Sequence, residues 1–118
     1  MSTKNFKIKA VDFKDLVPLS IGICIASDKI TVEGMDVGYM FRVKDENFKT
    51  GGWHFFSGTE TEEFANSAKN FDIYHINTIA NYDPTIIPYL HLPCGTELMR
   101  IYGTDKYEIL SEDYEMLD

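Results

Sequence analysis

The most constraining feature of this sequence is a short run at residues 21–26 that is apolar on both faces of an extended chain. It reads Ile-Gly-Ile-Cys-Ile-Ala and contains no charged residue. A strand that meets water on one side alternates apolar and polar residues, whereas a strand covered on both faces is apolar throughout. We therefore expect residues 21–26 to form a central strand of a sheet.

Other segments carry weaker strand patterns. Residues 37–43 alternate large apolar side chains with smaller or polar ones, and residues 53–57 are rich in aromatic side chains. The same criteria predict an edge strand at residues 6–10, a brief strand at 30–32, a short strand at 72–76 and a final hairpin of 98–102 with 107–110. Residues 44–52 are polar, end in two glycines and are expected to form a mobile loop.

Helix signals are fewer and shorter. Thr59 followed by Glu62 fits a capping box, in which a threonine oxygen and the glutamate three residues later satisfy free N–H groups. We expect a helix from Glu60 to about residue 67 that buries Phe64 and Ala68 on one face.

Two further helical turns are predicted after residue 76. Asn77 is expected to cap a turn, and Asp83 followed by Pro84 is typical of a helix start, where the missing N–H of proline costs nothing. Strand patterns outnumber helix patterns. The fold class is therefore α+β, with a mainly antiparallel sheet and one or two short helices in a single domain over residues 1–118. An acidic tail at residues 112–118 is expected to fray.

The charge is acidic and unevenly distributed. The chain of 118 residues has a net charge of −8, and residues 51–118 hold three Lys or Arg against twelve Asp or Glu, a net of −9. Nucleic-acid binding needs a basic face, and anionic membranes repel acidic proteins, so both classes of partner are disfavoured. A basic partner protein would be attracted. The alternative is that the charge only keeps the surface soluble.

Cysteine content and hydropathy favour a cytoplasmic protein. Cys24 and Cys94 are too few for a disulfide framework. Lysines interrupt the N-terminal stretch, so we expect no signal peptide, and the longest apolar run is far too short to span a membrane.

No arrangement of reactive residues predicts an enzyme, a metal site or a cofactor site. His54, His75 and His91 are separated by 21 and 16 residues, without the short spacings of zinc ligands. Ser57 lacks the flanking pattern of a nucleophile elbow, and Cys94 is close to a histidine in sequence only. The acidic residues around position 60 are explained by helix caps. We predict that the protein is not an enzyme.

The aromatic residues are more informative. Most of a set of five phenylalanines are expected in the core, the set being Phe6, Phe41, Phe55, Phe64 and Phe71. Trp53 either packs over the sheet or is an exposed anchor in a protein interface, where tryptophan is often a hot spot. The predicted partner-binding residues are Trp53, Glu60, Glu62, Glu63 and Asp83.

Four blocks occur in a recognisable order at residues 27–30, 37–42, 52–60 and 77–90. The third reads Gly-Trp-His-Phe-Phe-Ser-Gly-Thr-Glu, and the fourth contains Asn-Tyr-Asp-Pro. From about residue 20 to about residue 102, the chain resembles the immunity protein 33 family, which was formerly catalogued as a domain of unknown function. The resemblance implies a small cytoplasmic α+β protein of a bacterial polymorphic-toxin system, which binds a cognate toxin and neutralises it. It implies no catalytic residues.

Two functions follow as hypotheses. The first is an immunity protein that occludes the active site of its toxin with a preformed surface. The second is a regulatory or scaffold module that binds a protein or a small ligand outside any toxin system. A toxin-like reading frame immediately upstream would distinguish the first hypothesis from the second.

Overall fold

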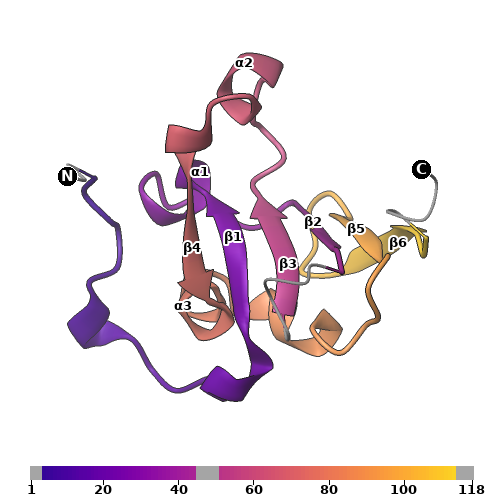
Figure 1. Cartoon of the computed structure of the whole chain (residues 1–118), viewed down its shortest axis with the longest axis horizontal. Helices are drawn as coiled ribbons and strands as arrows, with labels where there is room; N and C mark the ends of the chain where they lie inside the picture. Colours follow the sequence, from indigo (N-terminus) through magenta and orange to yellow (C-terminus); the bar gives the residue numbers. More distant parts are fainter. Residues whose placement is uncertain (1–3, 45–50, 114–118) are drawn as a thin grey trace.

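The protein forms one six-stranded sheet with short helices. The computed structural model describes residues 4–44 and 51–113. The strands are β1 (Ile23–Ser27), β2 (Tyr39–Arg42), β3 (Gly51–Phe56), β4 (Phe71–His75), β5 (Glu97–Arg100) and β6 (Tyr107–Ser111). They lie in the order β4-β1-β3-β2-β5-β6, with β1 and β3 parallel and every other neighbouring pair antiparallel (Figure 1). The prediction of an α+β fold with a mainly antiparallel sheet is confirmed.

The helical elements are all short. The α-helices are α1 (Asp28–Thr31), α2 (Glu62–Ala65) and α3 (Ile76–Tyr82), and the 3-10 helices are η1 (Ala10–Asp12), η2 (Leu19–Ile21), η3 (Ala68–Asn70) and η4 (Pro84–Tyr89). In Figure 1, α3 lies behind β1 and β4, whereas α2 stands beyond one end of the strands. Among the described residues, α3 therefore covers one face of the sheet, and no helix lies across the other.

The predicted central strand is β1, displaced by two residues from its expected start. It lies inside the sheet between β4 and β3. Cys24 and Ala26 are fully buried against the helices, while Ile23 and Ile25 point to the opposite face and are half-buried. The two-faced apolar pattern thus reflects two different environments, a closed core on one side and an aromatic surface on the other.

The core lies between the sheet and the helical layer. Its fully buried side chains come from the inward positions of the strands and from α1, α3 and η4. The largest are Trp53, Phe55, Ile30, Met40, Ile76, Ile79, Ile86 and Leu98. Trp53 and Phe55, two residues apart on β3, share this face, with ring centroids 6.1 Å apart.

Two glycines allow β3 to enter the middle of the sheet. Gly51 and Gly52 have φ values of +86° and +85°, which only glycine adopts without strain. A Cβ on Gly51 would lie 2.2 Å from the carbonyl oxygen of Ile23, and one on Gly52 would lie 2.2 Å from that of Val43. Side chains at these positions would therefore force β3 away from β1 and from the chain after β2. The mobile loop was predicted over residues 44–52, but Gly51 and Gly52 belong to β3, and residues 45–50 lie outside the described residues.

The N-terminal segment does not form the predicted edge strand. Residues 6–10 have no strand partner, and the segment turns through η1 instead. Polar side chains of α3 hold it: the Tyr82 hydroxyl accepts a hydrogen bond from the Ile8 N–H, and Asn77 Oδ1 accepts bonds from the N–H groups of Leu16 and Val17. The prediction that Asn77 caps a turn is therefore wrong, because its side chain ties this distant segment to α3.

Two other local predictions are wrong because capping residues lie elsewhere. The brief strand at residues 30–32 is part of α1, whose first turn is capped by Ser27 Oγ accepting from the Lys29 N–H. The helix expected from Glu60 is only the single turn α2. Its cap is Thr61, whose Oγ1 accepts from the Phe64 N–H, and α2 buries no residue. Thr59 is therefore not the N-cap.

Substitutions of two neighbouring phenylalanines on β3 test whether the two faces of the sheet differ in burial. We expect Phe55→Ala to lower the free energy of unfolding by about 3–5 kcal/mol, because it leaves a cavity in the closed core. Phe56→Ala removes the same atoms from the opposite, half-buried face and should cost less than about 2 kcal/mol. Urea unfolding of both variants measures the difference. Equal losses would show that both faces are equally closed.

Candidate functional site

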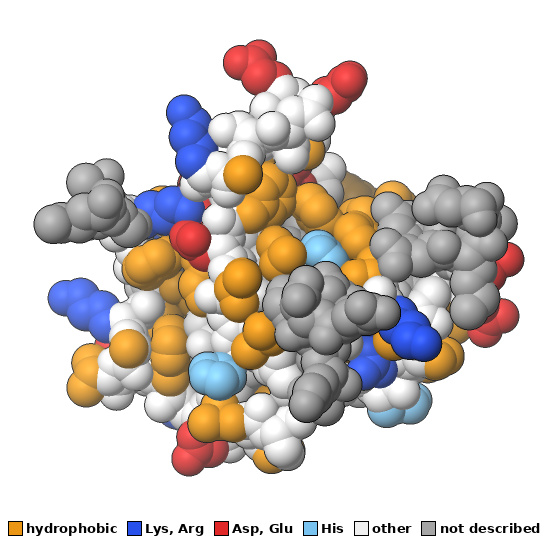
Figure 2. Space-filling model, viewed as in Figure 1, with side chains coloured by type: hydrophobic (Ala, Val, Ile, Leu, Met, Phe, Trp, Pro, Cys, Tyr) orange, Lys and Arg blue, Asp and Glu red, His pale blue; other side chains and the backbone are white. Residues whose placement is uncertain are grey.

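The face of the sheet opposite α3 carries a continuous apolar surface, here called the open face. Because side chains alternate along each strand, the register places one set of residues together on it. They are Ile23, Ile25, Tyr39, Phe41, His54, Phe56, Phe71, Ile73 and Met99. Among residues 4–44 and 51–113, no helix lies across this face, and Figure 2 shows its hydrophobic side chains over β4, β1 and β3.

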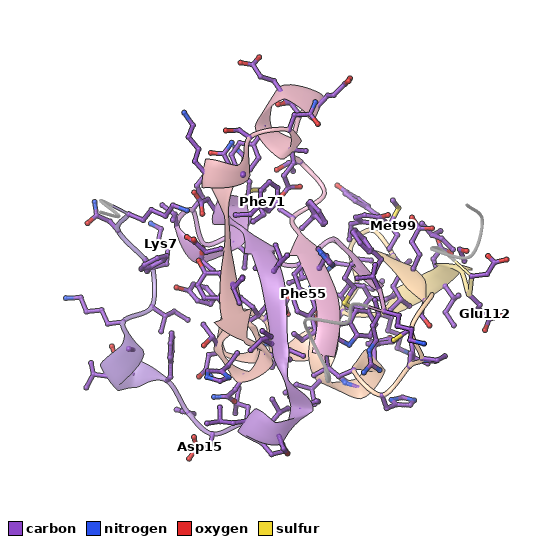
Figure 3. All side chains as sticks on the ribbon, in the orientation of Figure 1. Lys7, Asp15, Phe55, Phe71, Met99 and Glu112 are labelled. Carbon is purple, nitrogen blue, oxygen red and sulfur yellow. The ribbon has the colours of Figure 1, made fainter. Side chains whose placement is uncertain are left out.

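Aromatic rings form a stripe across the open face. Phe56 lies 5.5 Å from Phe71 and 5.8 Å from both Phe41 and Tyr39, measured between ring centroids. Phe41 stacks on His54 at 4.7 Å with an interplanar angle of 8°. These contacts keep the rings in fixed positions, so the aromatic stripe is a preformed surface. In Figure 3, Phe71 lies near one end of the open face and Met99 toward the other side.

Two hollows lie side by side on this face. The first, of about 410 Å³, is bounded by strand residues and by one wall from the α2–η3 region; its lining is Ile25, His54, Phe56, Ala65, Ala68, Phe71, Asp72 and Ile73. The second, of about 330 Å³, is lined by Tyr39, Phe56, Gly58, Glu60, Ala65 and Met99. Phe56 and Ala65 line both hollows and form the wall between them.

The charged residues that the strands place on the open face are acidic. Glu97 faces the same side as Phe41, and Glu108 the same side as Met99. No Lys or Arg occupies an open-face position of the described strands. The Tyr39 hydroxyl donates a short hydrogen bond to Glu97. The surface is therefore apolar in its centre and negative where it carries charge.

Glu60 occupies the second hollow as an ordered carboxylate. Its Oε2 accepts from the Ser57 N–H at 2.9 Å and from the Ser57 hydroxyl at 3.0 Å, and its Oε1 accepts from the Gly58 N–H at 2.9 Å. Partial burial alone would raise the pKa of Glu60, but hydrogen bonds from Ser27, Ser57 and backbone N–H groups outweigh it. The net pKa lies below the ordinary glutamate value, so the group stays charged at neutral pH.

The structure places Trp53 in the interior rather than on a contact surface. Its side chain is 1% exposed, and its Nε1–H donates to the Leu90 carbonyl at 3.3 Å. The Arg42 guanidinium lies 6.0 Å from the ring on the same inward side of the sheet. Of the two alternatives for Trp53, packing over the sheet is the one observed.

Asp83 is also buried, at 3% exposure. It begins η4 as predicted, accepting a hydrogen bond from the Thr85 N–H with Pro84 at the first position. It accepts another from the Val37 N–H at 2.9 Å and forms a short ion pair with Arg100. Asp83 therefore links three parts of the chain and does not present its carboxylate to a partner.

A tyrosine completes this buried cluster. Tyr107 donates its hydroxyl hydrogen to the Val37 carbonyl at 2.7 Å and receives a bond from Arg100 at 2.9 Å. Burial raises the pKa of Tyr107 to about 12. The hydroxyl thus stays protonated and remains a donor throughout the physiological pH range.

Glu62 and Glu63 are exposed on α2, where acidic side chains project at the end of the open face (Figure 2). The structure therefore brings Glu60, Glu62 and Glu63 to one end of the open face and keeps the other two predicted contact residues in the core. The partner-binding role of these three glutamates stays a prediction.

The sequence did not predict the aromatic stripe, because most of Phe6, Phe41, Phe55, Phe64 and Phe71 were expected in a single core. Of these five, only Phe55 is fully buried, and Phe6 is 41% exposed. Phe41 and Phe71 lie on the open face. The signal was present, since β2 and β3 carry large apolar residues at both odd and even positions.

Other kinds of site are not formed by the described residues. In residues 4–44 and 51–113, no three His, Cys, Asp or Glu side chains converge as metal ligands. Over the same ranges, no helix is long and apolar enough to cross a bilayer. Cys24 is buried and Cys94 is exposed, and both are free thiols.

Comparison with known proteins identifies the family. A family model described as the immunity protein Imm33 domain matches residues 24–110, which include the whole sheet apart from the first residue of β1 and the last of β6. The chain therefore belongs to the Imm33 immunity protein family, which implies neutralisation of a toxin and a cognate toxin as partner. The resemblance seen in the sequence is confirmed. Such proteins are typically non-enzymatic, in agreement with the expectation above. Comparisons with curated proteins and with solved structures gave no match.

The role of Asp83 is tested by two substitutions around Arg100. We expect Asp83→Ala to lower the free energy of unfolding by about 3–5 kcal/mol, because it leaves a guanidinium without its buried partner. Asp105 also pairs with Arg100, at 3.3 Å, but its side chain is 85% exposed. Asp105→Ala should therefore cost less than about 1 kcal/mol. Urea unfolding at neutral pH compares them, and similar losses would contradict the structural role of Asp83.

The lowered pKa of Glu60 predicts a dependence of stability on pH. Its folded-state pKa is below that of the unfolded chain, about 4.3, so the stabilisation is fully present above that pH. It is lost as the pH falls through the folded-state pKa. The parent should therefore be more stable than Glu60→Gln at pH 7. The difference in free energy of unfolding between the two proteins should be smaller at pH 3. Chemical denaturation at the two values measures this, and a constant difference would refute it.

Proposed function

We propose that this protein binds its cognate toxin through the open face and neutralises it by occluding the toxin's active site. The observation that carries the proposal is the preformed aromatic surface on the side of the sheet that the described helices leave free. Family membership supplies the partner class, and the open face supplies a place for that partner to bind.

The composition of the open face suits a protein partner. Contiguous exposed apolar surface on a small protein marks an interaction site, and aromatic side chains dominate binding energy in interfaces. Ile73 is 59% exposed in the middle of β4 and Met99 is 44% exposed on β5. The rings between them are held by mutual contacts, so little ordering entropy is lost on binding. Steric cover by such a surface needs no reactive group.

The charge of the face supports a basic toxin surface. The glutamates of α2 and Glu60 lie at one end of the open face, while the lysines of the N-terminal segment lie on the other side of β4 (Figures 2 and 3). Complementary charge speeds the encounter of two proteins and orients them. Two free thiols also suit a reducing compartment, so we place the neutralisation step in the cytoplasm.

Exposed aliphatic residues on and off the open face test where the toxin binds. The partner to use is the protein encoded by the reading frame immediately upstream. We expect Ile73→Asp to abolish neutralisation of that protein, because it places a charge in the centre of an apolar interface. Val11→Asp is the control, since Val11 is 86% exposed on the N-terminal segment. Growth of cells that co-express both proteins is the readout. Neutralisation by Ile73→Asp at the parental level would exclude the open face.

Charge reversal on α2 tests steering. Glu62→Lys with Glu63→Lys should slow association with the toxin more than it speeds dissociation, and the parental association rate should fall as salt rises. Asp12→Lys with Asp15→Lys is the matched control, because both residues are exposed and Asp15 lies at the opposite end of the molecule from α2 (Figure 3). Stopped-flow or surface-resonance kinetics at two salt concentrations measure the rates. A rate independent of salt would contradict an acidic docking surface.

A further inference from the structure

We propose that the second hollow of the open face receives an arginine or lysine side chain of the toxin, which binds against Tyr39 and Phe56 and points toward Glu60. The inference rests on the proposed function, because it names the chemistry by which the open face recognises its partner. The hollow then has a specific role in recognition. Simple occlusion of the toxin's active site would not require such a hollow.

The hollow combines the groups that bind an organic cation. Its walls are the rings of Tyr39 and Phe56, whose centroids are 5.8 Å apart, together with the thioether of Met99. Aromatic faces attract ammonium and guanidinium groups, and arginine also stacks on them through its planar group. Glu60, which is acidic, is also among the residues that line the hollow. A neutral apolar side chain of the toxin would fill the hollow but would not pair with the negative charge of Glu60.

Glu60 is prepared for such a role by its surroundings. Three hydrogen bonds from Ser57 and Gly58 fix the position of its carboxylate, and its lowered pKa keeps it ionised. In the described part of the chain, the ion pairs formed by Lys and Arg go to Asp28, Asp72, Glu33, Asp83 and Asp105, and none goes to Glu60. Within the described residues, the Glu60 carboxylate therefore has hydrogen-bond donors but no ion-pair partner, and a cationic side chain of the toxin would supply one.

The neighbouring first hollow sharpens the description of the partner. It shares Phe56 and Ala65 with the second hollow and is lined mainly by apolar residues such as Ile25 and Ile73. Two adjacent hollows of different character suit two nearby side chains of a toxin segment. One is basic and lies against Tyr39, and the other is apolar and lies against β1 and β4.

The first experiment needs no toxin. The protein is titrated with N-acetylarginine amide and, separately, with N-acetylcitrulline amide, which has the same shape without the charge. We expect the arginine probe at millimolar concentration to shift the NMR signals of the Tyr39 and Phe56 rings, and the citrulline probe to shift them far less. The arginine-induced shifts should be lost in Glu60→Gln. Equal shifts from both probes, or none from the arginine probe, would overturn the proposal.

The second experiment uses the toxin encoded immediately upstream. Glu60→Gln keeps the size of the side chain but removes its charge and one of its two acceptor oxygens, and Phe56→Leu keeps an apolar group without a π face. Each should weaken toxin binding by roughly tenfold in calorimetric titration. Asp15→Asn is the control, because Asp15 is exposed at the opposite end of the molecule from α2 (Figure 3), and it should change binding less than twofold. Thermal unfolding of each variant confirms that the comparison is made between folded proteins.

Double-mutant cycles then identify the cation. Each surface Arg or Lys of the toxin is replaced in turn by Met, and the loss of affinity is measured against parent and Glu60→Gln. One toxin residue should lose its effect when Glu60 is neutralised. If every toxin cation acts additively with Glu60→Gln, the proposal is overturned. If Glu60→Gln and Phe56→Leu neutralise the toxin as well as the parent does, the proposed function stands and this inference fails. If the parent does not bind the toxin, the proposed function fails.

Discussion

The parallel pairing of β1 with β3 is the interaction on which the rest of the structure depends. It joins Cys24 to Trp53 and Ala26 to Phe55 in register and so places the two largest buried side chains beside the apolar strand that needs cover. The pairing requires Gly51 and Gly52, since any Cβ there would meet backbone atoms at about 2.2 Å. With this pair in place, β4 adds to the outer side of β1 and β2 to the outer side of β3.

The pairing also produces two unequal faces. Side chains alternate along each strand, so large apolar residues at successive positions supply a closed core and an exposed aromatic surface at once. The helices are short and pack on the core side, where the buried Asp83–Arg100 cluster attaches η4 to β5 and to the chain before β2. The open face is therefore a direct consequence of a sheet whose strands are apolar on both sides and a chain with few helical residues.

If the toxin binds the open face as proposed, this arrangement separates the residues that stabilise the fold from those that recognise the partner. The residues that hold the fold are Trp53, Phe55, Asp83 and Arg100, and they lie behind the sheet. The residues available to a toxin lie in front of it or on α2. Substitutions on the open face can then alter specificity at limited cost to folding, because its rings are only half-buried. Glu60 belongs to both sets, since it stabilises the turn after β3 and carries charge into the second hollow.

The sequence by itself determined the fold class, all six strands to within two residues, the cap at Asp83 and the family. These depend on local patterns: periodicity, a proline after an aspartate, and blocks of residues in a recognisable order. Predictions from local sequence patterns were wrong where contacts with residues distant in the sequence determine the structure of a segment. Residues 6–10 alternate like a strand, but the Tyr82 hydroxyl hydrogen-bonds to the backbone of Ile8 instead of a strand partner. Thr59 resembles a cap, although Thr61 supplies it.

Only the tertiary structure decided which apolar residues face the core and which face outward. A strand that is apolar at every position carries no signal for the direction of its side chains, so the register of its neighbours must set it. That register buried Trp53, and it placed the half-buried aromatic stripe on the open face rather than in the core. It also gathered Glu60 with Tyr39 and Met99, residues far apart in the chain, because β2 lies between β3 and β5 in the sheet.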